Sequence, residues 1–334
     1  MARALPGQAA ASVAERAGAL RVIAPARLHL GFLDLEGGLG RRFGSLGLTI
    51  EGIATRLAIA RAPSNETAGA GEVEDRARAL LARLGDLGLP PARVAIESAI
   101  PSHAGLGSGT QLGLALGVGL ARLGGLGLDA RDVARLLERG ARSGIGVGAF
   151  EQGGFLLDGG RGDADEPPPI TARLEFPEAW RLLLILDRAG SGLHGARERD
   201  AFANLPPYPG ELAGHLCRLV VMRLLPGLVA ADLAAVGSAI GEVQRRVGDH
   251  FAPAQGARFT SPAVAEVLGW LEAQGIPGVG QSSWGPTGFA ILGDRDAAQH
   301  LQRAAERRFG ERHPSLRFHV TRARNRGAAI EPIG

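Results

Sequence analysis

The sequence predicts an α+β protein of two domains, with a glycine-rich phosphate-binding loop in the first domain. Three observations predict it. Residues 20–62 consist of short β-type runs, residues 101–111 form a glycine-rich turn that leads into an apolar helical run, and residues 159–169 are charged and end in three prolines. Strands followed by helices are typical of α+β domains. A charged, proline-rich stretch is typical of a domain junction.

Length and composition agree with two folded domains. The chain has 334 residues, of which 45% are hydrophobic, and this is ample for real cores. Residues 1–19 contain no sustained apolar run, so we expect a disordered tail and no signal peptide. We expect a phosphate-binding α+β domain over residues 20–165 and a second α+β domain over residues 170–328.

The first domain is expected to alternate between strands and helices. Helices are predicted over residues 71–85, 109–123 and 130–143, with Asp129 as the N-cap of the third. The strands precede and separate them, because their residues are β-branched or alternate in polarity. Strands are expected at residues 21–24, 27–34, 46–50, 54–59 and 93–98.

The second domain reads as a mixture of strands and amphipathic helices, without an internal repeat. Residues 180–186 are nearly all apolar, which is typical of a buried strand. Helices are expected next, and the end of the domain reads as strand, helix, strand. The helices are predicted at residues 212–225, 228–246, 262–274 and 297–309, and the last two strands at 289–292 and 317–321.

The glycine-rich turn is built to hold phosphate. Its glycines permit positive φ and a close backbone approach to a ligand, and the first amides of the following helix have no partner within the helix. Two hydroxyl side chains add further groups that reach phosphate or magnesium. The spacing matches neither the Walker loop nor the dinucleotide fingerprint. The expected phosphate-binding residues are Gly105, Leu106, Gly107, Ser108, Gly109, Thr110 and Gln111.

Composition excludes several other classes of protein. The single cysteine, Cys217, excludes an internal disulfide and a cysteine metal cluster, and fits a reducing cytoplasm. The chain contains no lysine, so every lysine-dependent mechanism is excluded. The apolar run at residues 112–121 is about half the length of a membrane span. The basic stretch at residues 303–326 is interrupted by acidic residues and lacks an aromatic platform, so we expect neither a nucleic-acid nor a membrane partner.

Three segments together resemble a known superfamily. These are the strand at residues 27–34, the loop at 101–111 and the glycine-rich segment at 280–288. Their order resembles the small-molecule kinases of the galactokinase, homoserine, mevalonate and phosphomevalonate (GHMP) superfamily. The resemblance covers roughly residues 20–325. It implies a GHMP-like fold in which the middle segment wraps phosphates, the late loop packs beside it, and the second domain is ferredoxin-like.

One departure argues against a kinase. Many of these kinases carry a Ser-Gly-x-Asp segment whose aspartate deprotonates the acceptor hydroxyl. In this chain Gly146 stands where that aspartate would fall, within the similar segment at residues 143–154. A glycine cannot accept a proton. An ATP-dependent small-molecule kinase with a base from elsewhere therefore remains an alternative, as does a non-catalytic ligand-binding relative.

The closer resemblance is to the β-ribofuranosylaminobenzene 5'-phosphate synthase family, and residues 27–34, 105–111, 143–155 and 280–286 carry it. It implies a decarboxylating phosphoribosyltransferase that joins 4-aminobenzoate to phosphoribosyl pyrophosphate and releases CO2 and pyrophosphate. This is the first step of tetrahydromethanopterin biosynthesis. The resemblance also implies Mg2+ and a cytoplasmic homodimer. The choice between 4-aminobenzoate and 4-hydroxybenzoate stays open.

These expectations assign roles to individual side chains. We expect Arg27, His29 and Glu151 to be catalytic, and Ser108, Glu151 and Asp34 to hold magnesium. A guanidinium fork suits phosphate or carboxylate. Further substrate-binding candidates are Arg41, Arg42, Ser282, Ser283 and Thr287.

Several of these residues also have purely structural interpretations. A histidine in an apolar strand, such as His29, is often a satisfied structural residue, and Asp34 falls on the opposite strand face unless a bulge intervenes. Glu151 is equally suited to an ion pair. Trp284 is suited either to packing or to stacking on an aromatic substrate, and His194 either to chemistry or to a solvated loop.

Overall fold

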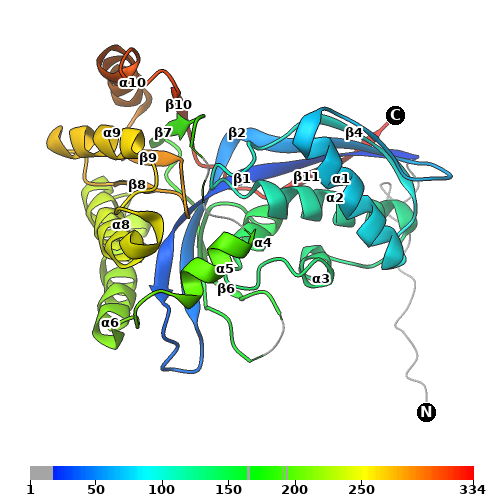
Figure 1. Cartoon of the computed structure of the whole chain (residues 1–334), viewed down its shortest axis with the longest axis horizontal. Helices are drawn as coiled ribbons and strands as arrows, with labels where there is room; N and C mark the ends of the chain where they lie inside the picture. Colours follow the sequence, from blue (N-terminus) through cyan, green and yellow to red (C-terminus); the bar gives the residue numbers. More distant parts are fainter. Residues whose placement is uncertain (1–17, 164–165, 191, 193–194) are drawn as a thin grey trace.

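The structure is a computed structural model that describes residues 18–163, 166–190, 192 and 195–334. The predicted tail at residues 1–19 therefore lies outside the described residues except for its last two positions. His194 also lies outside them. Figure 1 shows two α+β layers side by side, one around a long twisted sheet and one around a smaller sheet.

The larger sheet is built on two long antiparallel strands, β1 (Ala19–Asp34) and β2 (Phe43–Arg61). Each replaces a predicted pair of short strands. Bulges between Pro25 and Arg27 and between His29 and Gly31 interrupt the polarity pattern without ending β1. The remaining strands are β3 (Glu66–Ala68), β4 (Ala92–Ser98), β5 (Phe155–Asp158), β6 (Ile170–Leu174) and β11 (Ala329–Ile333). The strand order of the sheet is β11-β1-β2-β4-β3. In addition, β5 pairs with β2, and β6 pairs with β5.

Helices cover one face of this sheet (Figure 1). They are α1 (Gly71–Asp86), α2 (Ser108–Gly124), α3 (Ala130–Leu136) and α4 (Ile145–Glu151). The predicted N-cap is confirmed, because the Asp129 carboxylate accepts hydrogen bonds from the amides of Arg131 and Asp132. The prediction that this helix continues to residue 143 is wrong. Glu138 and Gly140 take positive φ values of 54° and 80°, which ends the helix.

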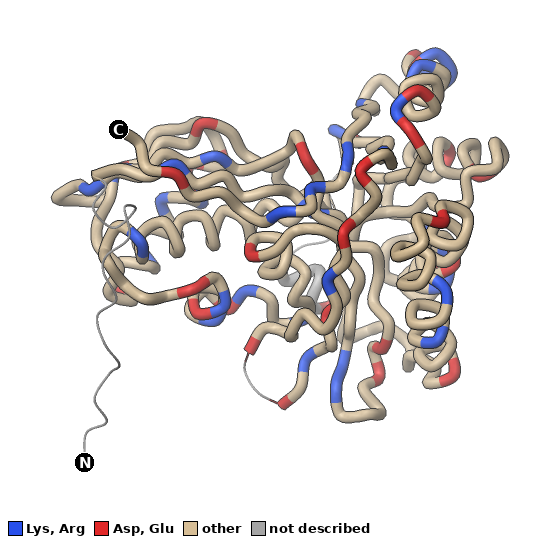
Figure 2. Tube along the Cα trace, turned by 180° about the vertical axis from the view of Figure 1, so that it is seen from behind, with Lys and Arg blue, Asp and Glu red and all other residues tan. Residues whose placement is uncertain are grey.

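The smaller sheet has the ferredoxin-like order that was expected. Its strands are β7 (Arg181–Asp187), β8 (Val279–Gln281), β9 (Gly288–Leu292) and β10 (Leu316–Thr321), arranged β10-β7-β9-β8. Helices α9 (Pro262–Ala273) and α10 (Arg295–Phe309) pack on one face. Helix α8 (Leu233–Gln255) packs on the other. Helix α10 carries charged residues of both signs, and Figure 2 colours the positions of Lys and Arg blue and those of Asp and Glu red along the Cα trace.

The predicted division between the domains differs from the observed one. Strand β6 begins at residue 170 but pairs with β5 in the first sheet, and β11 returns to pair with β1. One hydrophobic core also joins the two sheets, because Leu28 and Leu48 share it with Leu184. The boundary predicted from prolines and charge therefore does not separate two cores.

Residues 195–229 carry short helices between the two sheets, namely α5 (Gly195–Ala203), α6 (Gly210–Leu219), η2 (Val220–Leu224) and α7 (Leu225–Val229). The run Gly210–Val229 is long and apolar enough, by length and composition alone, to cross a membrane. Its Leu216, Val220 and Leu224 are buried in the core shared with α8 and β1. These three side chains therefore contribute to the core of the fold.

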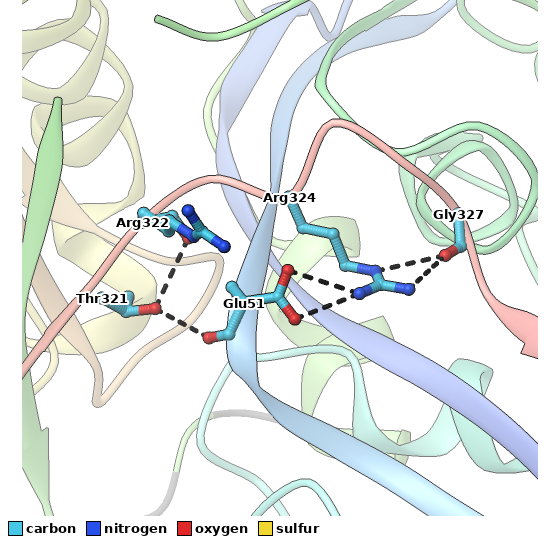
Figure 3. Close-up of polar contacts among 5 residues, drawn as sticks. All are labelled: Glu51, Thr321, Arg322, Arg324 and Gly327. Atoms are coloured by element: carbon cyan, nitrogen blue, oxygen red, sulfur yellow. Dashed lines mark hydrogen bonds and ion pairs between the residues drawn. The ribbon is translucent and has the colours of Figure 1, made fainter. Parts of the chain in front are cut away.

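A buried arginine fastens the returning C-terminal segment to β2 (Figure 3). Arg324 is only 7% exposed; it donates to both carboxylate oxygens of Glu51, at 3.0 and 3.3 Å, and to the carbonyl of Gly327. Thr321 adds a bond of 2.7 Å from its hydroxyl to the Glu51 carbonyl. These contacts position the segment between β10 and β11.

Replacing Arg324 by methionine is expected to lower the free energy of unfolding by about 2 kcal/mol, because acceptors of charge-assisted bonds lose their donor. Urea unfolding measures the change. Arg322→Met is the control, since that side chain is exposed on the same segment. Equal effects of the two substitutions would contradict this role for Arg324.

Candidate functional site

The predicted phosphate loop is a turn that delivers unpaired amides to the start of α2. Gly105 and Gly107 have φ values of 78° and 87°, and Gly107 is the N-cap residue. No side chain of the described residues caps the helix, so the backbone amides of Ser108, Gly109 and Thr110 have no partner within it. The prediction of a glycine-dependent turn at a helix start is confirmed. Such a helix start attracts anions.

The three segments that carried the resemblance meet at this loop. Arg27 donates from its guanidinium to the Gly105 carbonyl at 2.6 Å, and its backbone amide donates to the Leu106 carbonyl at 3.1 Å. The Ser282 hydroxyl donates to the same Gly105 carbonyl at 2.7 Å and accepts from the His29 amide at 3.0 Å. The loop is therefore held by β1 on one side and by the late glycine-rich segment on the other.

Two arginines that the sequence did not single out flank the start of α2. A β-carbon built on Gly109 would lie 2.8 Å from Nη2 of Arg76 and 3.8 Å from Nη1 of Arg139. Arg76, on α1, donates to the Ser102 hydroxyl at 3.0 Å. Burial lowers the pKa of Arg139, and the charges of Arg76 and Arg83 lower it further. Two like charges beside unpaired amides form a site for a multiply charged anion.

These arginines carry no recognisable sequence signal. Arg76 lies in the helix predicted at residues 71–85, and Arg139 in the one predicted at 130–143. Exposed helical arginines are common, and only the packing of α1 and α3 against α2 brings these two together. The Nε atom of Arg139 is buried without a hydrogen-bond partner among the described residues. A bound anion would satisfy it.

The position expected for a kinase base is closed. A β-carbon on Gly146 would lie 2.8 Å from the Thr110 methyl group, and the Gly146 carbonyl accepts a hydrogen bond from the side-chain Nε2 of Gln111 at 2.7 Å. Thr110 and Gln111 therefore pack directly against α4. An aspartate at position 146 would require the Thr110 side chain to shift.

The predicted magnesium ligands do not come together. Asp34 accepts hydrogen bonds from the amides of Glu36 and Gly37, both at 2.9 Å, and so closes a turn. It lies seven residues from Arg27, roughly 23 Å along the strand. Glu151 ends α4 and pairs with Arg131 at 3.6 Å, and burial raises its pKa. Neither carboxylate is a partner for Ser108, and the predicted catalytic role of Glu151 has no support in this geometry.

The arginines of the β1–β2 turn are structural. Arg41 donates to the carbonyls of Gly159 and Gly160, each at 2.6 Å. Arg42 donates twice to the Leu35 carbonyl, at 3.0 and 3.1 Å, and lies over the Phe43 ring. Both guanidiniums are bonded to neighbouring backbone, and the expectation that they bind phosphate stays a prediction.

The three predicted residues of the segment at 280–288 lie in three different environments. Ser282 is committed to holding the phosphate loop. Ser283 has a φ of 56° and donates from its amide to the His29 carbonyl at 3.1 Å. Thr287 is fully buried and lines a cleft of about 700 Å³ between the two sheets, together with Ser102 and Arg317. These three side chains do not line one cavity.

His29 is buried and uncharged. It is 4% exposed, and its ring lies 4.6 Å from that of Phe32. Burial, with a smaller contribution from the nearby Arg27 charge, lowers the pKa of His29 to about 3. The imidazole is therefore neutral across the physiological range. It can accept a hydrogen bond but cannot supply a proton near pH 7.

This burial predicts an acid-sensitive stability. Below pH 6.5 the unfolded chain binds a proton at His29 that the native state does not, so the free energy of unfolding falls as pH drops from 6.5 toward 3. The slope is up to about 1.4 kcal/mol per pH unit. Urea unfolding at pH 4.5 and 7.5 should show a smaller difference for His29→Gln than for the wild type. His300→Gln is the control, because His300 is exposed. If His29→Gln showed the same difference in the free energy of unfolding between the two pH values as the wild type, His29 would not be the group responsible.

Comparison with known proteins assigns the fold. The GHMP kinases N terminal domain matches residues 73–154, and the GHMP kinases C terminal domain matches residues 224–312. A solved homoserine kinase from Cytophaga hutchinsonii superposes with a TM-score of 0.64 at 18% identity, covering 98% of this chain and all of the other. Mevalonate diphosphate decarboxylase from Staphylococcus aureus gives 0.65 at 13%, covering 95% and 98%.

Two curated relatives define the family more narrowly than the domain matches do. The β-ribofuranosylphenol 5'-phosphate synthase of Archaeoglobus fulgidus is 32% identical over 324 residues, which are 93% of this chain and 99% of the relative. The protein of the same name from Methanothermobacter thermautotrophicus is 30% identical, covering 91% and 96%.

The fold and the phosphate loop define a protein of the GHMP class that lacks the usual aspartate of its kinases. The Thr110 side chain packs where the side chain of that aspartate would begin. Within that class, the chain belongs to the β-ribofuranosylphenol 5'-phosphate synthase family and is an enzyme of the pentosyltransferase type.

Proposed function

We propose that this enzyme joins a 4-substituted benzoate to phosphoribosyl pyrophosphate, releasing CO2 and pyrophosphate, as the first step of tetrahydromethanopterin biosynthesis. The relatives are named for a phenol product, which corresponds to 4-hydroxybenzoate as acceptor. The family resemblance of the sequence implied 4-aminobenzoate and left the choice between the two acceptors open. The two acceptors differ in one hydrogen-bonding group, and both are carried into the test below.

The observation that supports this proposal most directly is the pair Arg76 and Arg139 at the start of α2. In the reaction, the ring carbon that bears the carboxylate forms a bond to the anomeric carbon of the ribose. At the same time, the bond between the anomeric carbon and the pyrophosphate oxygen breaks. Negative charge develops on the leaving pyrophosphate. Unpaired amides and two guanidiniums stabilise such a charge without reorganising.

The same reaction explains why no base is required at position 146. The group lost from the ring is CO2. The electrons of the broken bond between the ring and the carboxylate restore the aromatic system, so no acceptor hydroxyl has to be deprotonated. A kinase requires that deprotonation. The packing of Thr110 against Gly146 is therefore compatible with the transferase, whereas a kinase would need a base from elsewhere in the chain.

Magnesium dependence stays an expectation, with a different ligand set from the one the sequence suggested. Asp34 and Glu151 are engaged elsewhere, and no group of three or more metal-binding side chains occurs among the described residues. We derive no step through the ion. Assays with added Mg2+ and with EDTA measure the dependence directly.

The test supplies phosphoribosyl pyrophosphate, Mg2+ and carboxyl-labelled 4-hydroxybenzoate or 4-aminobenzoate, and follows labelled CO2 and pyrophosphate together. Equal release of both products is expected. ATP turnover with a small alcohol and no CO2 release would instead support the kinase alternative. Binding of phosphoribosyl pyrophosphate without turnover would support the non-catalytic alternative.

A cytoplasmic homodimer completes the proposal. The surface of residues 210–229 leaves Val221, Met222 and Val229 55%, 70% and 76% exposed. Exposed apolar side chains of this kind favour a protein contact. Light scattering after gel filtration measures the mass, and a monomer at micromolar concentration would contradict this part.

A further inference from the structure

The cleft between the two sheets has the dimensions of a ligand site. Its volume is about 700 Å³, and its described walls come from β2, from residues 98–104 after β4, from the end of β7 and from β10. Pockets that bind small molecules typically measure about 300–1,000 Å³. The cleft therefore has room for a phosphorylated sugar.

Strand alternation directs side chains of the smaller sheet into this cleft. Arg317 and His319 of β10 pair with Leu186 and Leu184 of β7, and these leucines face the core between the two sheets. Paired residues of neighbouring strands point to the same face of a sheet. In addition, a β-carbon built on Gly52 of β2 would lie 3.8 Å from Nε2 of His319. The imidazole therefore lies across the cleft from β2.

Positive charge exceeds negative charge along the cleft. In the part of the chain that the structure describes, its walls carry three arginines, namely Arg56, Arg188 and Arg317, and one acidic residue, Asp187. The Asp187 carboxylate accepts a hydrogen bond of 2.7 Å from the Ser261 hydroxyl, so it is already engaged with the protein. A cleft with an excess of one sign of charge attracts ligands of the opposite sign. The expected ligand is an anion.

Two of the three arginines are uncommitted. The side chains of Arg56 and Arg188 are exposed, and neither forms a hydrogen bond or an ion pair with another described residue. By contrast, Arg317 donates from Nη1 to the carbonyls of Pro314 and Leu316, at 2.8 and 2.7 Å. Arg56 belongs to the larger sheet and Arg188 follows a strand of the smaller one. A phosphate in the cleft therefore has free guanidinium donors on both sides.

One guanidinium joins this cleft to the start of α2. Ser102 lines the cleft, and its hydroxyl accepts a hydrogen bond from Nη1 of Arg76 at 3.0 Å. Nη2 of the same side chain would lie 2.8 Å from a β-carbon on Gly109. Both nitrogens belong to one planar group. The cleft and the unpaired amides of α2 thus adjoin the same guanidinium, and one ligand with an anionic group at each end can occupy both.

We propose that the cleft receives the ribose 5-phosphate half of phosphoribosyl pyrophosphate, while the pyrophosphate half lies at the start of α2. The proposal rests on the function proposed above. The donor carries a phosphate monoester at one end of its sugar and a pyrophosphate at the other, which matches the two adjoining sets of cationic groups. The hydroxyls of Ser98 and Ser102 are suited to hydrogen bonds with the ribose hydroxyls. This arrangement places the anomeric carbon beside Arg76, where the bond to pyrophosphate breaks.

Binding of the two halves of the donor tests this division without requiring turnover. Calorimetry measures the dissociation constants of ribose 5-phosphate and of pyrophosphate for the wild type and for Arg56→Met and Arg188→Met. Each variant is expected to raise the constant for ribose 5-phosphate about tenfold and to leave that for pyrophosphate unchanged. Arg139→Met should have the opposite pattern, because Arg139 lies beside the start of α2.

Arg322→Met is the matched control for both cleft variants. It removes the same charge from an exposed position after β10, outside the residues that line the cleft. Both dissociation constants should stay at the wild-type values. If Arg322→Met weakened ribose 5-phosphate as much as Arg56→Met does, the effect would come from the net charge of the protein, and the assignment of the cleft would be wrong.

The intact donor provides a second measurement. Phosphoribosyl pyrophosphate should bind at least about 100-fold more tightly than either half, because its second anionic group binds intramolecularly once the first is bound. Arg56→Met should reduce this advantage about tenfold. An intact donor that binds no more tightly than pyrophosphate alone would show that the cleft does not hold the sugar phosphate.

The outcomes separate this inference from the function on which it rests. Ribose 5-phosphate binding that Arg56→Met and Arg188→Met weaken, in a protein that releases no CO2 from either benzoate, would leave the cleft assignment standing and sink the transferase. Normal turnover in both variants, with an unchanged KM for phosphoribosyl pyrophosphate, would leave the transferase standing and sink the cleft assignment. Absence of binding at millimolar ribose 5-phosphate, with and without pyrophosphate, would also overturn the cleft assignment.

Discussion

Replacing Arg139 by methionine is expected to lower kcat/KM for phosphoribosyl pyrophosphate about 100-fold, which corresponds to about 2.7 kcal/mol of transition-state stabilisation. The guanidinium lies beside the first amides of α2, where the leaving pyrophosphate gains charge. Steady-state kinetics with varied phosphoribosyl pyrophosphate measure the loss. Methionine preserves most of the apolar stem, so packing changes little.

The stability of the same variant separates a functional arginine from a structural one. Burial and the neighbouring Arg76 and Arg83 charges disfavour the charged form of Arg139, as its lowered pKa shows. Removing the charge should leave the unfolding temperature unchanged or raise it. Arg83→Met is the kinetic control, since Arg83 is on α1 but pairs with the exposed Glu138. A destabilised Arg139→Met with normal kinetics would show that Arg139 serves the fold alone.

Gly105→Ala is the second substitution with a large expected effect: activity should fall at least 100-fold, and the free energy of unfolding by about 3 kcal/mol. A β-carbon at this position would lie 2.3 Å from the Ser282 carbonyl oxygen and 3.0 Å from that of Gly285. Backbone atoms on both sides cannot move aside cheaply. The phosphate loop and the late segment must separate, and Arg27 then loses its carbonyl partner.

Gly125→Ala is the matched control for that substitution. Gly125 has a φ of 69°, close to the 78° of Gly105, but nothing lies within 4 Å of its β-carbon position. Its substitution reports the cost of the left-handed backbone alone, about 1 kcal/mol. Unfolding in urea and turnover are measured for both variants. Similar losses of stability and activity in Gly105→Ala and Gly125→Ala would mean that the contact between the glycine-rich turn and the late segment is unimportant.

The phosphate loop was predictable because its determinants are local. Glycines with positive φ and an uncapped helix start follow directly from residues 105–111. The convergence of Arg27 and Ser282 on that loop followed from the resemblance, because no rule of spacing joins residues so far apart. Long strands were predicted in pieces, since a bulge such as the one between His29 and Gly31 breaks the alternation on which the prediction relies.

The remaining site residues depend on tertiary packing. Asp34 and Glu151 are acidic residues beside suggestive motifs, yet one closes a turn and the other pairs with Arg131. Arg76 and Arg139 lie beside no motif and still reach the start of α2. Which of many arginines face inward is decided by how α1 and α3 pack on α2, and a single sequence does not contain that information.

The return of β11 to β1 makes the assembly of the larger sheet a late event in synthesis. Residues 19–23 pair on one side with β2 and on the other with residues 329–333, so about 300 residues of chain must be completed between the two partners. Until then the start of β1 presents an open edge capable of pairing with another chain. Contacts of such long sequence separation also slow folding. Expression at low temperature or with chaperones should therefore raise the yield of correctly folded enzyme, by protecting that edge during translation.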